Sequence, residues 1–92
     1  MVDGLVIKHI NLKKDVPQTV EFTGGLNKLG IVNMGNHEVY FKVDDITLVD
    51  TQDNTANFLN RIVRAVDIDK DDAFTTVTFV SNGPSSVQWD FL

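Results

Sequence analysis

The sequence predicts an all-β domain, a small antiparallel β-sandwich or barrel-like sandwich of about six to eight short strands. Short runs of β-branched and aromatic residues alternate with polar residues, and clusters of Gly, Asn and Ser separate these runs. The length of 92 residues accommodates one hydrophobic core. We therefore expect residues 1–92 to form a single domain.

Alternation of apolar and polar residues marks the strands of the first half. It is clearest in residues 37–43, where every second residue is valine or phenylalanine. Gly24 and Gly25 predict a turn, because glycine takes positive φ without steric cost. The Asn-Met-Gly-Asn run at 33–36 favours a hairpin loop. The strands expected on this basis are residues 5–10, 16–22, 28–32 and 37–43.

The end of the chain repeats this arrangement. In residues 75–80, Val77 and Phe79 alternate with threonines, and the Ser-Asn-Gly-Pro-Ser run that follows predicts a turn. Residues 87–92 then form the returning strand. The chain is thus expected to contain two equivalent hairpins, one in each layer of a sandwich.

The sequence of residues 55–66 is compatible with either a helix or a strand. Their apolar residues recur at helical spacing, and a polar residue stands before them to cap a first turn. In a strand, Phe58, Ile62 and Val66 would share one side, and polar residues would interrupt it. A short helix is therefore kept as an alternative to a further strand.

Composition excludes several classes of function. The chain has no cysteine, which excludes disulfides, thiolate zinc sites and cysteine nucleophiles. Thirteen acidic residues against eight basic ones give a net charge of −5, which disfavours nucleic acid as a partner. No apolar run approaches the ~18 residues of a membrane span. The first residues show no secretory pattern, so we expect synthesis and folding in the cytoplasm.

The acidic run at 67–72 raises the question of calcium. Asp67, Asp69 and Asp71 have the spacing of the first three ligands of a calcium loop. Asp72, however, stands where the loop needs glycine, and Thr78 stands where it needs a bidentate glutamate. We expect a solvated turn before the strand at 75–80 and keep the three aspartates as calcium candidates.

The residue types that support catalysis are scattered. His9 and His37 lie far apart and lack metal-ligand spacing, and the serines at 81–86 lack a nucleophile-elbow motif. Aspartates in loops could supply the carboxylate pair of a glycosidase, although such residues are usually only solvated. We expect a protein that is not an enzyme and has no cofactor. The aspartates concerned are Asp44, Asp45, Asp50 and Asp53.

One face of the strand at 37–43 is the candidate partner or ligand surface. Trp89 belongs with the apolar face of its strand and is expected in the core. Tyr40 lies opposite the apolar face of its own strand, between Glu38 and Lys42. An exposed tyrosine can stack on a sugar ring or on another protein. Glu38, Tyr40 and Lys42 therefore form the expected binding surface.

Residues 19–45 and 75–92 together resemble the small β-sandwich virion structural proteins of tailed bacteriophages. In those proteins a strand leads through a Gly-rich turn into a Val/Ile-Asn-x-Gly strand end, a Val-Tyr-x-Lys strand follows, and a Ser/Gly turn precedes the last strand. The matching residues here are Gly24, Gly25, Ile31, Val32, Asn33, Gly35, Val39, Tyr40, Lys42, Asn82, Gly83 and Val87.

The resemblance implies a non-enzymatic virion protein that is made in the host cytoplasm. Its expected role is that of a capsid decoration or cement protein that binds the major capsid protein, as a homo-oligomer on the virion. A tail, baseplate or fibre component is the alternative. A carbohydrate-binding or adhesion module is a separate hypothesis, which Tyr40 and the acidic loops motivate.

Overall fold

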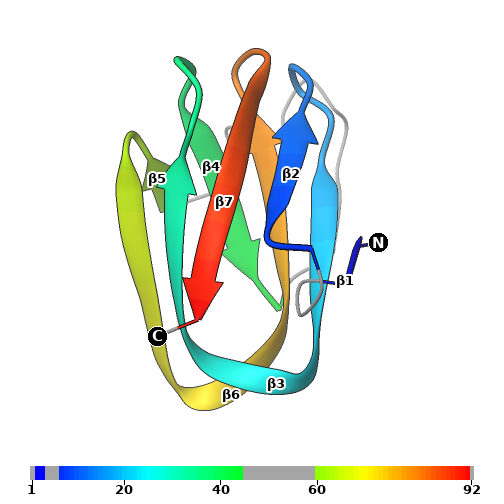
Figure 1. Ribbon diagram of the computed structural model, residues 1–92, viewed down its shortest axis with the longest axis vertical. Helices are drawn as coiled ribbons and strands as arrows, with labels where there is room; N and C mark the ends of the chain where they lie inside the picture. Colours follow the sequence, from blue (N-terminus) through cyan, green and yellow to red (C-terminus); the bar gives the residue numbers. More distant parts are fainter. Residues whose placement is uncertain (1, 4–6, 45–59, 92) are drawn as a thin grey trace.

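The computed structural model describes residues 2–3, 7–44 and 60–91, and this part of the chain is all-β, as predicted (Figure 1). One sheet, mostly antiparallel, curls into a half-barrel. No helix in the described residues is long or apolar enough to cross a membrane. The strands are β1 (Val2–Asp3), β2 (His9–Leu12), β3 (Gln18–Asn33), β4 (Val39–Val43), β5 (Asn60–Ile62), β6 (Ala65–Ser81) and β7 (Ser85–Phe91).

Two long, bent strands organise the sheet. β3 and β6 have 16 and 17 residues, pair antiparallel and turn over together at the lower end of Figure 1. Each strand therefore contributes one half to each side of the half-barrel. β2, β7, the second half of β3 and the first half of β6 form the front side. β1, the other halves of β3 and β6, β4 and β5 form the back.

Gly24 and Gly25 bend β3 without ending it. Both have positive φ, 85° and 81°, and the pairing register with β6 shifts between Glu21 and Leu26. Leu26 pairs with Phe74 after the shift, so the ladder resumes beyond the bend. The prediction that a strand ends in a turn at Gly24 and Gly25 is therefore wrong. These glycines curve a continuous strand, because the partner strand curves beside it.

Both predicted hairpins are wrong. β4 pairs with β5 and β6, whereas β3 pairs with β1, β6 and β7. The link at 34–38 consequently runs from the front to the back, and the link at 82–84 runs from the back to the front. The two links remain equivalent, but each connects the two sides. In the sheet, β6 lies between β3 and β4, and β3 lies between β6 and β7. These intervening strands come from distant parts of the chain, so the turn residues do not indicate them.

The remaining differences concern strand boundaries. Of the expected strand at 5–10, residues 9–10 lie in β2, residues 7–8 belong to no strand, and residues 5–6 lie outside the described residues. The acidic run at 67–72 lies within β6, where a turn was expected. In the segment at 55–66, residues 60–66 contain β5, a bend and the start of β6. The helix is therefore absent from that part, and residues 55–59 lie outside the described residues. Two strands are also much longer than predicted.

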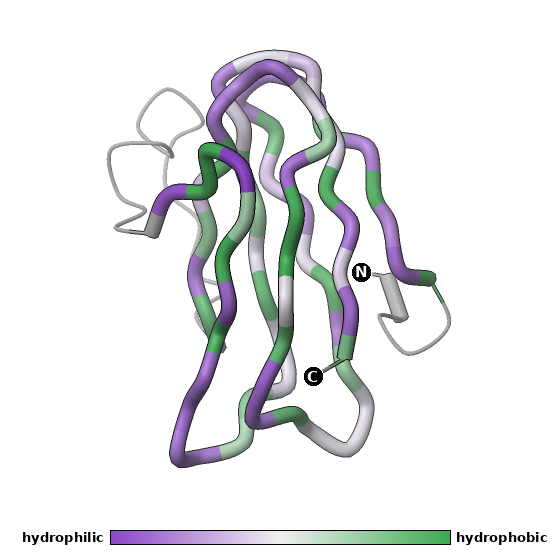
Figure 2. Tube along the Cα trace, turned by 60° about the vertical axis from the view of Figure 1, so that its left-hand side comes forward, coloured by the Kyte–Doolittle hydropathy of each residue, from purple (hydrophilic) through white to green (hydrophobic). Residues whose placement is uncertain are grey.

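Aromatic rings from both sides fill the core. Trp89 of β7 stacks on Phe79 of β6, with ring centroids 6.4 Å apart, and meets Phe22 of β3 edge-on at 6.0 Å. All three side chains are fully buried, as expected for Trp89. Figure 2 shows how hydrophobic and hydrophilic residues alternate along the strands that supply this core. The core side chains are Leu12, Val20, Phe22, Leu29, Ile31, Val39, Phe41, Ile62, Ile68, Phe74, Val77, Phe79, Val87 and Trp89.

The bend gives a first prediction. Gly24→Ala should lower the free energy of unfolding by about 1 kcal/mol, because alanine strains at positive φ. Gly25→Ala should cost more than Gly24→Ala, since its Cβ would also lie 3.2 Å from the Ala73 Cβ, whereas the space at Gly24 is open. Urea denaturation measures both. Two variants as stable as the parent would contradict the assignment of these glycines to the bend.

Candidate functional site

The predicted surface on β4 is an ordered, hydrogen-bonded cluster. The Tyr40 hydroxyl donates to Glu38 Oε2 at 2.8 Å and accepts from Asn82 Nδ2 at 3.3 Å. Arg61 lies opposite Tyr40 across the β4–β5 ladder, and its Nη1 is 3.7 Å from Glu38 Oε2. Lys42 lies two residues along the same face. We call Glu38, Tyr40, Lys42, Arg61 and Asn82 the β4 face.

The β4 face combines several kinds of polar and aromatic group. It presents an aromatic ring, a carboxylate, an amide and a guanidinium within one contiguous patch. The Arg61 and Glu38 side chains are 58% and 38% exposed, so their ion pair contributes little to stability and can exchange for contacts with a ligand. The face can therefore bind polar groups of a protein or a sugar.

Sequence reasoning predicted three members of this face and missed two. Arg61 lies in β5, which pairs with β4. Asn82 follows β6 and is about 40 residues beyond Tyr40 in the sequence. Long-range pairing alone brings these residues to Tyr40, and no local pattern signals it. Alternation within one strand, by contrast, is sufficient to group Glu38, Tyr40 and Lys42.

A buried asparagine fixes the links around this face. Asn33 Nδ2 donates to the carbonyls of His37 at 2.7 Å and Ile62 at 3.1 Å. Its Oδ1 accepts from Gly35 N at 3.0 Å and from Ser85 Oγ at 2.8 Å. The side chain of Asn33 thus ties the end of β3 to the segments that lead into β4, β6 and β7. The sequence placed Asn33 in a loop and gave no sign of this role.

The calcium candidates lie along one strand. Asp67, Asp69 and Asp71 occupy alternate, exposed positions of β6. Alternate residues of an extended strand are about 6.5–7 Å apart, whereas a calcium loop curls its ligands around one ion. Across the described residues, no group of three or more His, Cys, Asp or Glu side chains is placed to hold a metal ion.

The other candidates are dispersed. Exposed His9 contacts Asn11 through Nε2, 3.3 Å from Oδ1. A Cβ at Gly83 would lie 2.7 Å from the His37 ring, which shows how closely that ring covers the second link. Asp44 Oδ1 accepts from the backbone amides of residues 75 and 76, so this carboxylate supports the fold. Asp45, Asp50 and Asp53 lie outside the described residues.

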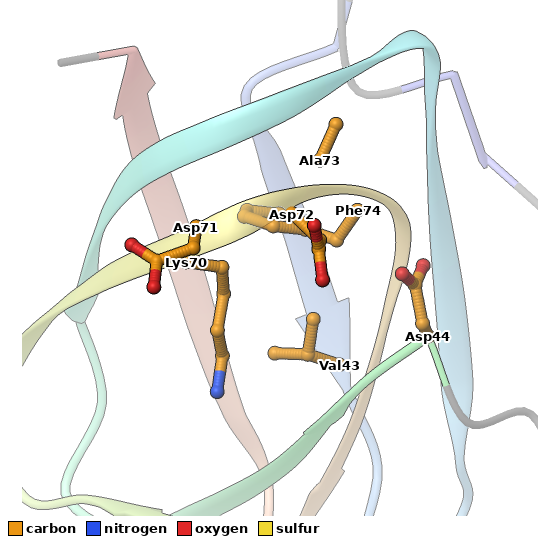
Figure 3. Close-up of a pocket in the computed structure, with 7 residues that line it drawn as sticks. All are labelled: Val43, Asp44, Lys70, Asp71, Asp72, Ala73 and Phe74. Atoms are coloured by element: carbon orange, nitrogen blue, oxygen red, sulfur yellow. The ribbon is translucent and has the colours of Figure 1, made fainter.

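A second surface is visible only in the structure. Two adjoining hollows, of about 310 and 170 Å³, lie where the end of β4 faces the first half of β6. Asp44 and Asp72 point into the larger hollow from opposite sides, and Lys70 extends toward β4, whereas Asp71 points away (Figure 3). We call this surface the seam. Its lining residues are Phe41, Val43, Asp44, Val66, Asp67, Ile68, Asp69, Lys70, Asp71, Asp72, Ala73 and Phe74.

Comparisons of the chain with protein-family models, with curated proteins and with solved structures found no match. The β4 face and the seam are therefore the features of the described residues that bear on function.

The buried asparagine gives a second prediction. Asn33→Ala should lower the free energy of unfolding by about 3 kcal/mol, because it leaves buried carbonyls and the Ser85 hydroxyl without partners. Asn27→Ala is the matched control. The Asn27 amide also donates to two carbonyls, but at an exposed site, and its loss should cost less than about 1 kcal/mol. Equal costs in chemical denaturation would refute the role of Asn33.

Proposed function

We propose that the protein is a non-enzymatic structural protein of a tailed-bacteriophage virion that decorates the capsid surface by binding the major capsid protein. The observation that carries the proposal is the pair of surfaces on a small β body, an ordered polar face on β4 and an open seam beside it. Both surfaces are suited to binding a protein neighbour. The resemblance in residues 19–45 and 75–92 supports a capsid protein as the neighbour.

Strand edges support this proposal. β2 is a terminal strand of the sheet, and the first half of β6 pairs with β3 on one side only among the described residues. Unpaired edges are available for pairing with another chain. A capsid presents many identical neighbours, and symmetric contacts with them would cover these edges repeatedly. The net charge of −5 favours a protein shell over packaged DNA as the contact.

The proposal is tested on virions of the phage that encodes the chain. We expect the protein in purified particles at a fixed ratio to the major capsid protein, measured by quantitative mass spectrometry. Deletion of its gene should lower the temperature at which heads release DNA. Measuring the protein separately in purified heads and in purified tails distinguishes capsid decoration from a tail, baseplate or fibre role. A soluble protein that never accompanies particles would exclude all of these roles.

The β4 face favours a second candidate, a carbohydrate-binding or adhesion module. Aromatic rings flanked by carboxylate and amide groups suit the apolar faces and hydroxyls of sugars. On a glycan array, Tyr40→Ala should abolish binding. Tyr40→Phe, which retains the ring and loses both hydroxyl contacts, should weaken it by about tenfold. A parent protein that binds no glycan would remove this candidate.

A further inference from the structure

The floor of the seam is apolar. Val43 and Val66 are half-buried and pack against the core, and Phe41, Ile68 and Phe74 lie buried beside them. The core therefore extends to the surface between β4 and β6. Apolar side chains placed on Val43 and Val66 would extend this core and gain hydrophobic burial.

The edge of β6 that borders the seam exposes backbone groups. Asn33 N donates to the Arg64 carbonyl at 2.7 Å, so residue 64 and every second residue after it direct their backbone groups toward β3. Ala65, Asp67 and Asp69 consequently direct their N–H and C=O groups the other way. Among the described residues, no strand pairs with this first half of β6 on that side, because β4 pairs only with residues 77–81 farther along the same edge. An incoming strand would find its hydrogen-bonding partners there.

The side chains along this edge are strongly acidic. Five aspartates border the two hollows, Asp44, Asp67, Asp69, Asp71 and Asp72, against the single ammonium of Lys70, and of these the Asp71 carboxylate points outward. A second copy of the chain, which has a net charge of −5, would be repelled. A basic segment would be attracted, since opposite charges across neighbouring strands stabilise their pairing.

From these three observations we propose that the seam binds an extended protein segment in which lysine or arginine alternates with small apolar residues. The segment pairs with the free edge of β6, its apolar side chains cover Val43 and Val66, and its basic side chains face Asp67 and Asp69. If the proposed function is correct, the segment belongs to the capsid protein, and only this identification depends on that function.

The test uses the full chain and two blocked nonapeptides of identical composition. One alternates five lysines with four valines, and the other groups them in two blocks. Calorimetry should show that the alternating peptide binds more tightly, and that added salt weakens binding. Hydrogen exchange at the amides of Ala65, Asp67 and Asp69 should slow when this peptide is bound. Equal binding of both peptides, or unchanged exchange, would overturn the proposal.

Charge reversal supplies the matched variants. Asp67→Lys with Asp69→Lys should weaken binding of the alternating peptide by about tenfold. Glu21→Lys with Asp90→Lys makes the same charge change at exposed strand positions elsewhere and should weaken it less than twofold. If the acids serve only to keep other copies away, the first pair would leave peptide binding unchanged and promote self-association, which would refute the proposal.

The same variants separate the seam from the proposed function. A seam variant that has lost peptide binding but still joins virions would show that the capsid contact lies elsewhere. The identification of the segment with the capsid protein would then fail, and the proposed function would stand. If the parent chain binds the alternating peptide but is absent from virions, the seam proposal stands and the proposed function fails.

Discussion

The antiparallel pairing of β3 with β6 is the constraint on which the rest of the structure depends. Because both strands bend together, one ladder supplies the centre of both sides of the half-barrel. Every other described strand attaches directly or indirectly to this pair. The left-handed backbone at Gly24 and Gly25 permits the bend, and the fully buried rings of Phe22, Phe79 and Trp89 fill the space it encloses. A chain that bent elsewhere would separate these rings.

The same bend determines where the surfaces lie. It carries β6 from the front side to the back, so that the acidic start of β6 and the end of β4 face each other across the seam. At the other end of the molecule, Asn33 holds the links that position β4 and β7. The positions of the β4 face and the seam are therefore consequences of the fold of the core and of the two links that Asn33 holds.

Local patterns predicted what depends on alternation. The faces of β4 and the burial of Trp89 follow from side-chain periodicity in a strand, and both are observed. The pairing of strands does not follow, because an Asn-Gly link looks the same whether it joins neighbours in a sheet or crosses between its two sides. Arg61 and Asn82 reach Tyr40 only through such long-range pairing. The acidic run at 67–72 looked like a turn, since charge disfavours strand interiors, but at an unpaired edge each carboxylate remains in water.

We propose that this protein acts by binding protein neighbours through the β4 face and the seam. Cross-linking mass spectrometry on intact virions with a lysine-reactive reagent tests it most directly, because Lys42 lies on the β4 face and Lys70 borders the seam. We expect cross-links from one or both of these lysines to the major capsid protein, and fewer from Lys8, Lys13 and Lys28. Virions that contain the protein but show no cross-link at Lys42 or Lys70 would contradict it.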